Sequence, residues 1–213
     1  MSCHSHSHSH NHGHDDHSHV PPIPTNQSQS LRQHIDFHRL SGLNTHQPND
    51  ELSSVFKPHV DRFSLCGQID SDADTQLILN IPFNGYVKLY SIIIRTAGEP
   101  ENCPKTIKLY KNNTSLDFDH IEHTRPTLTL DHPELGVLDT SGDVDTHEDS
   151  FVEHFLPRNQ FQSTTQRTLF IEDNWDGDEE STTTIYYIEI RGQLQSPLNK
   201  EPVIAIYEAA TNP

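Results

Sequence analysis

Short runs of alternating apolar and polar residues, bounded by Gly, Pro, Asn or Asp, cover most of the chain after about residue 31. This alternation is typical of half-buried β-strands. Asn84-Gly85 lies between two of these runs and predicts a hairpin turn. No long segment has the 3.6-residue period of a helix, and only residues 31–43 could hold a short one. The expected strands are 77–82, 86–94, 106–111, 127–130, 151–155, 168–171, 183–190 and 203–207.

The same alternation assigns a face to each strand. Ile81, Leu89, Leu109 and Ile188 are expected to point into the core, whereas Tyr110 would lie on the opposite face. Several short strands without intervening helices are typical of two packed antiparallel sheets. The sequence therefore predicts an all-β fold, an antiparallel β-sandwich or jelly roll.

The first thirty residues differ in composition from the rest of the chain. They contain eight of the 17 histidines, two acidic residues, no Lys or Arg, and only four apolar side chains. Such a segment cannot bury enough apolar surface to offset the entropy lost on ordering. We therefore expect a disordered His-rich tail over residues 1–24, a folded domain over 25–200, and a C-terminal strand with a short tail over 201–213.

Alternating histidines in the tail form the clearest candidate for metal chemistry. Imidazoles on a flexible chain can gather around Zn²⁺, Ni²⁺ or Cu²⁺, but this tract fixes neither ligand number nor geometry. The alternative is a soluble tail that binds metal adventitiously and has no selected role. If Met1 is removed and Ser2 is not acetylated, the amine, two amides and His4 could also form a square-planar copper or nickel site. The candidate ligands are His4, His6, His8, His10, His12 and His14.

Other candidate sites are weaker. Residues 70–74 and 173–180 resemble calcium loops, but Thr75 replaces the glycine of an EF-hand and Trp175 stands where a ligand is needed. We interpret both segments as solvated turns. Trp175 either caps the sandwich edge or is an exposed contact residue. His120 and His123 would need a helical turn to share one face.

Charge and cysteine content limit the partners and the compartment. The chain has 31 acidic and 14 basic residues, a formal net charge of −17. Such a chain repels phosphate, so we expect neither nucleic acid nor anionic membrane as a partner, and basic protein surfaces are favoured. No apolar run is long enough to span a membrane, and no signal peptide is recognised. Three cysteines without a CxxC pair indicate free thiols in a reducing compartment.

Motifs of common enzyme classes are absent from the sequence. It contains no dinucleotide-binding glycine fingerprint, no P-loop, no nucleophile elbow and no HExxH. Cys66 and Cys103 lack the basic neighbours that activate a thiolate, apart from Lys105, so buried or inert thiols are expected. We therefore predict no enzymatic activity, no catalytic residue and no cofactor beyond adventitious metal.

Several collinear blocks resemble the PITH domain, a family named for its interaction with the proteasome and its occurrence in thioredoxin-like proteins. The first block is Ser71-Asp72-Ala73-Asp74-Thr75-Gln76-Leu77-Ile78, and the resemblance extends from about residue 30 to 207. The chain is similar to the stand-alone members, because a His-rich tail stands where thioredoxin-like members have a redox domain with CxxC. The further blocks are 35–36, 40, 43–44, 55–58, 80–83, 85–89, 107–112, 118–119, 161–162, 169–171, 174, 184–185, 188–192 and 207–209.

This resemblance implies a galactose-binding-like jelly roll that acts as a non-enzymatic interaction module in cytoplasm and nucleus. It also implies association with the proteasome regulatory particle, and the protein is expected to be a monomer. Reductase activity is not implied, because the CxxC is missing, and no family motif assigns contact residues. Two alternatives stay open: a binding module for a glycan or small molecule, by analogy of fold, and metal handling by the tail.

Overall fold

The computed structural model describes residues 23–96, 100–114, 116–135, 148–178 and 180–198. Antiparallel strands dominate these residues, so the predicted all-β sandwich is confirmed. The strands are β1 (Ser41–Leu43), β2 (Ile69–Asp70), β3 (Leu77–Arg95), β4 (Pro104–Lys111), β5 (Leu128–Asp131), β6 (Phe151–Phe155), β7 (Thr164–Asn174), β8 (Thr184–Ile185) and β9 (Tyr187–Pro197). The helical elements are α1 (Phe118–Ile121) and the 3-10 turns η1 (Gln27–Gln29), η2 (Arg32–His34), η3 (Leu52–Val55), η4 (His59–Asp61), η5 (Pro100–Asn102) and η6 (Glu148–Ser150). None of the helices in these ranges has the length and hydrophobicity to cross a membrane.

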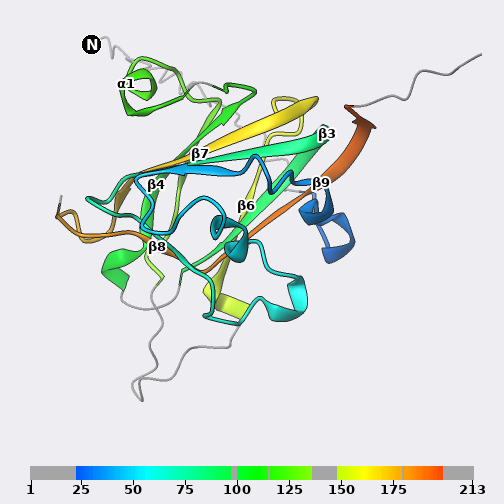
Figure 1. Cartoon of the computed structure of the whole chain (residues 1–213). Coiled ribbons are helices and arrows are strands. Elements are labelled where there is room, and N and C mark those ends of the chain that lie inside the picture. Colours follow the sequence, from blue (N-terminus) through cyan, green and yellow to red (C-terminus); the bar gives the residue numbers. More distant parts are fainter. Residues whose placement is uncertain (1–22, 97–99, 115, 136–147, 179, 199–213) are drawn as a thin grey trace, which may run out of the picture.

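The long strand β3 connects the two parts of the sandwich. Its first half lies between β1 and β7 in the strand order β1-β3-β7-β4-β5. Its second half lies between β9 and β6. Figure 1 shows β3 and β7 side by side, and β9 pairs with the opposite edge of β3. Each half of β3 therefore belongs to a different group of strands around one core.

The hairpin predicted at Asn84-Gly85 is wrong, because the two expected strands are the single strand β3. Backbone pairing with β9 begins at this point, with Gly85 opposite Pro197. A side chain at Gly85 would place its Cβ 2.5 Å from Leu194 Cδ1 and 2.7 Å from the Ser196 oxygen. The glycine thus permits a close approach of β9 next to the register shift between Tyr86 and Val87 in the β3–β9 pairing.

The helix considered for residues 31–43 is also absent. This segment forms the 3-10 turn η2 and the strand β1. Its backbone instead pairs with strand edges: the Leu31 amide donates to the Ile190 oxygen, and Ile35 forms a bridge with Phe83. Long-range pairing with the sandwich therefore outweighs the local helical tendency.

The expected inward face of the strands is confirmed. Ile81, Leu89, Leu109 and Ile188 are at most 1% exposed and belong to one apolar cluster. Tyr110 lies on the opposite face, as predicted, but this face is buried as well. Tyr110 packs with Ile78 and Phe170 under the segment that carries α1. The expected strand at 203–207 and the tail over residues 1–22 lie outside the described residues.

We expect Leu109→Ala to lower the free energy of unfolding by about 3 kcal/mol, because it opens a cavity in the main cluster. Urea unfolding at neutral pH measures this change. Lys88→Ala on the partly exposed face of β3 is the matched control and should change stability by less than about 0.5 kcal/mol. Equal effects of the two substitutions would contradict the assigned face of β4.

Candidate functional site

A pocket of about 490 Å³ opens on the outer face of β4 and β7, beside α1. Its floor is aromatic: Tyr110 and Phe170 are each 3% exposed, and Phe118 packs edge-on against Phe170 with ring centroids 6.2 Å apart. Above this floor Lys108 Nζ lies 2.6 Å from Glu172 Oε1. The alternation in β4 and β7 places these side chains together, because Lys108, Tyr110, Phe170 and Glu172 share one face of two paired strands.

A second pocket of about 360 Å³ continues from the first and shares Gln76 and Glu172 with it. Its other charged lining residues are Asp74, Asp173 and Asp178, and no Lys or Arg lines it. We call the two pockets together the β4–β7 groove. One end of this groove is aromatic and the other is acidic.

Backbone amides hold the three aspartates of the acidic end, within the local turn for Asp74 and Asp178 and across the β4–β7 strand pair for Asp173. Asp74 Oδ1 accepts from the Gln76 amide at 2.8 Å, Asp173 Oδ1 from the Thr106 amide at 2.7 Å, and Asp178 Oδ1 from the Glu180 amide at 3.0 Å. Asp residues in turns commonly accept nearby backbone amides in this way. In each of these bonds the carboxylate uses one oxygen, Oδ1.

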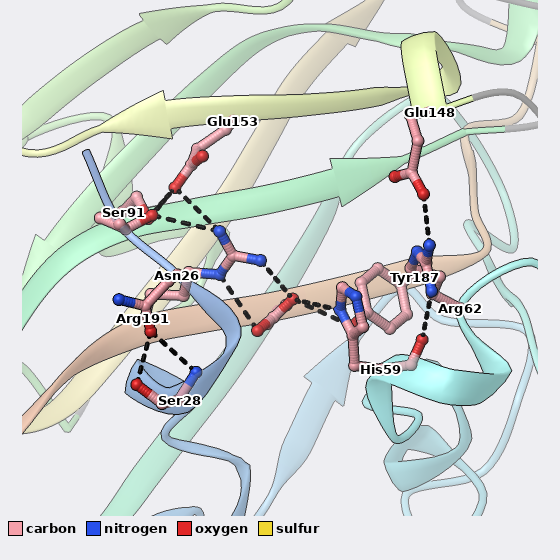
Figure 2. Close-up of polar contacts among 11 residues, drawn as sticks. Asn26, Ser28, His59, Arg62, Ser91, Glu148, Glu153, Tyr187 and Arg191 are labelled. Atoms are coloured by element: carbon pink, nitrogen blue, oxygen red, sulfur yellow. Dashed lines mark hydrogen bonds and ion pairs between the residues drawn. The ribbon is translucent and has the colours of Figure 1, made fainter.

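A charged network covers the outer face of β9, β3 and β6 (Figure 2). At its centre the Arg191 guanidinium donates to Glu189 from Nε at 3.1 Å and from Nη2 at 3.3 Å. Tyr187 Oη also donates to Glu189, at 3.1 Å, and His59 Nδ1 lies 3.5 Å from the same carboxylate. Burial, together with the charge of Glu189, raises the pKa of Tyr187. Glu189 and Arg191 are 5% and 8% exposed, so this network holds elements together and offers little surface to a partner.

The network also fastens the segment that precedes η1. Thr25 Oγ1 donates to Glu153 and accepts from Arg191 Nη1 at 3.2 Å. Ser91 Oγ of β3 donates to the same Glu153 carboxylate at 2.5 Å. The side chains on this face therefore connect four separate parts of the chain.

Two histidines meet where β5 ends beside β6. His132 Nδ1 lies 2.8 Å from His154 Nε2, and burial lowers the pKa of both side chains, that of His132 to about 3. Nε2 of His132 is buried without a hydrogen-bond partner among the described residues. A proton there would be an unpaired buried donor, so the favoured neutral form carries its proton on Nδ1 and donates it to His154. The pair is a neutral structural contact between the two groups of strands.

Arg167 is a buried cation on the core side of β7. It is fully buried, and its guanidinium lies 4.3 Å from the centre of the Phe161 ring. Within the described parts of the chain, none of its three nitrogens has a hydrogen-bond partner. Burial lowers the pKa of Arg167 to about 9, so the side chain stays charged at neutral pH.

We expect Arg167→Met to raise the free energy of unfolding by about 3 kcal/mol near pH 7. The lowered pKa corresponds to a burial cost of about 5 kcal/mol, and the loss of the ring contact removes about 2 kcal/mol of stabilisation. The pKa of Arg167 is lower in the folded state than in the unfolded state, so wild type should gain stability as the pH rises above about 9. The difference in free energy of unfolding between the variant and wild type should therefore become smaller above that pH. Thermal and urea unfolding measure this difference in stability, and Arg125→Met, at an exposed arginine, is the control. A less stable Arg167→Met would show that the guanidinium has a favourable partner in solution.

The structure separates most of the residues considered from sequence. The expected solvated turn does not include Asp70, which is the last residue of β2, pairs with Thr184 of β8 and accepts hydrogen bonds from the side chains of Gln47, Gln68 and Thr184. Trp175 is 37% exposed, and its Nε1 donates to the His132 oxygen at 3.0 Å, so it caps the end of β5. Within the described ranges, no group of three or more His, Cys, Asp or Glu residues is placed to hold a metal ion.

His120 does lie in the helical turn that its spacing with His123 requires. Its Nδ1, however, lies 2.6 Å from Asp117 Oδ1, and His123 lines the β4–β7 groove. Of the cysteines, Cys66 is exposed, whereas Cys103 is buried and its pKa is raised by that burial. The predicted metal ligands His4 to His14 lie outside the described residues.

Comparison with known proteins places this geometry in a family. The model of the PITH domain matches residues 21–211. Mouse and human proteins named "PITH domain-containing protein 1" are each 31% identical over 195 residues, which cover 91% of this chain and 83% of theirs. A fucolectin from striped bass serum has a TM-score of 0.49 and 12% identity, over 78% of this chain and 49% of its own. The family model and the two relatives together show that this chain belongs to the PITH domain family.

Proposed function

We propose that this protein is a non-enzymatic interaction module that associates with the proteasome regulatory particle in cytoplasm and nucleus. The observation that carries the proposal is the match of the PITH domain over residues 21–211, since this family is named for its interaction with the proteasome. The net charge of −17 supports it, because an acidic surface attracts basic patches on a protein partner.

The arrangement of the described side chains is consistent with binding through a surface. The buried Arg191 network and the His132–His154 pair are occupied in holding strands together. The β4–β7 groove is open to solvent and carries both apolar and charged groups. A contact that depends on exposed charge should weaken with salt, because the Debye length falls from about 8 Å at 0.15 M to about 5 Å at 0.4 M.

Retention of regulatory-particle subunits on the immobilised full-length protein tests this proposal. Purified particles should be retained at low salt and released as salt rises. An unrelated acidic protein of similar size and charge is the control. Equal retention on both proteins would show that the particles bind nonspecifically to negative charge. Absence of retention on this protein would contradict the proposal.

A variant with the six tail histidines changed to serine separates this function from metal handling. The variant should retain the particles as wild type does, with or without a chelator. Loss of retention in the variant would assign the interaction to the tail. The substituted residues are His4, His6, His8, His10, His12 and His14.

A further inference from the structure

We propose that the β4–β7 groove binds an extended segment of a partner protein in which an apolar side chain lies a few residues from lysine or arginine residues. This inference rests on the proposed function as an interaction module and names the surface and the chemistry of the partner. It depends on the different character of the two ends of the groove.

The aromatic end fits an apolar side chain. Tyr110 and Phe170 form a rigid floor, since both are 3% exposed and belong to one apolar cluster with Ile78, the cross-strand neighbour of Phe170. Phe118 stands at 73° to Phe170 and closes one side. The pocket above this floor has about 490 Å³, which is enough for one large apolar side chain and its backbone.

The acidic end fits a cation. Asp74, Asp173 and Asp178 line this part together with Glu172, and none of its lining residues is basic. Glu172 is already paired with Lys108, whereas the three aspartates form hydrogen bonds with amide groups and no ion pair with a basic side chain of the described residues. The acidic surface continues past Gly177 along Asp176, Asp178 and Glu180. A guanidinium or ammonium group would reduce the mutual repulsion of these carboxylates.

The two ends together set which part of the bound segment lies in each pocket. Lys108 and Arg125 line the aromatic pocket and balance the charges of Glu122 and Glu172, so this pocket attracts a cation less than the acidic pocket, which no basic residue lines. The apolar side chain should therefore lie near α1 and the basic residues near 173–178. A phosphate-bearing ligand would be repelled by the aspartates. A metal ion is not favoured, because no group of three or more metal-ligating residues is assembled in the described ranges.

A labelled peptide tests this assignment directly. The probe is fluorescein-Gly-Leu-Gly-Gly-Lys-Arg-Lys-Gly, and its anisotropy is measured with the full-length protein at low salt. The matched probe replaces Lys-Arg-Lys by Glu-Asp-Glu. The basic peptide should bind and the acidic peptide should not. Equal binding of both peptides, or no binding of the basic one, would overturn the inference.

Three charge-removing substitutions locate the binding. In Asp74→Asn/Asp173→Asn/Asp178→Asn, each side chain keeps an oxygen at Oδ1 to accept its amide hydrogen bonds, so the fold should persist, and the thermal midpoint verifies this. The variant should bind the basic peptide about tenfold more weakly, as expected for the loss of three solvent-screened charge contacts. The control Asp50→Asn/Glu51→Gln/Asp61→Asn removes the same charge on exposed residues elsewhere and should change the affinity less than about twofold. An equal loss in both variants would overturn the groove as the site.

The same two variants in the particle-retention assay distinguish failure of this inference from failure of the proposed function. If wild type retains regulatory particles and the groove variant retains them equally well, the groove inference is overturned and the proposed function stands. If wild type retains no particles, the proposed function fails, and the peptide measurements alone decide whether the groove binds basic segments.

Discussion

Acidification from about pH 6.5 to 3.5 should cost this protein about 4 kcal/mol more of its free energy of unfolding than it costs a His132→Asn variant. The reason is the buried neutral pair of His132 and His154. Burial lowers the pKa of His132 from 6.5 to about 3, and it lowers the pKa of His154 in the same direction. Each pKa unit corresponds to about 1.4 kcal/mol.

The direction follows from proton binding in the two states. Below pH 6.5 the unfolded chain binds a proton at His132, whereas the folded protein does not until the pH approaches about 3. The pair's full contribution is therefore present above pH 6.5 and is lost as the pH falls. Protonation of both histidines in the folded state would give two neighbouring buried cations. A proton added at Nε2 of His132 would also find no acceptor among the described residues.

Urea unfolding at a series of pH values measures this difference. Asparagine in place of His132 keeps a polar group near the position of Nδ1 and does not titrate. The control is His123→Asn, an exposed histidine whose loss should leave the pH profile unchanged. Parallel profiles for wild type and His132→Asn would contradict the buried neutral pair.

Glu189→Ala should lower the free energy of unfolding by about 4 kcal/mol, which is the typical cost of removing one partner from a buried ion pair. The substitution takes from Arg191 both of its contacts with Glu189 and takes from Tyr187 its hydrogen-bond acceptor. Arg191 would keep Glu153 at 3.6 Å and Thr25, so the protein should still fold at low temperature.

Two further variants separate charge from packing. Glu189→Gln keeps an acceptor for Tyr187 and should cost less, about 1–2 kcal/mol. Glu189→Ala/Arg191→Met also removes the arginine that has lost its partner, and should be more stable than Glu189→Ala alone. Guanidinium or thermal unfolding of the series measures these values. If the double variant is no more stable than Glu189→Ala, the cost does not come from the unpaired arginine.

The face of each strand could be predicted because it depends only on alternation along the chain. Leu109 and Tyr110 lie on opposite faces as expected. The alternation could not show that the face of Tyr110 is covered, since the cover comes from residues 116–121, which carry no strand pattern. The β4–β7 groove lies beside this cover, so local pattern could not reveal it either.

Charged residues in the strands show the same limit. Arg167 lies on the apolar face with Leu169 and Ile171. Its place in the alternation was therefore a signal in the sequence that this charge is buried. Glu189 and Arg191 alternate with Ile188 and Ile190, which is also the pattern of a solvent-facing strand edge. Their burial results from Thr25 and His59, which the folded chain brings onto this face.

By itself the sequence determined the fold class, the inward faces and the family, because strand alternation and collinear blocks are local properties. Only the tertiary structure decided that β3 runs unbroken through Asn84-Gly85, that residues 31–43 pair with strand edges, and that His132 meets His154. These features depend on contacts between residues distant in sequence, whose pairing and burial outweigh local turn and helix preferences.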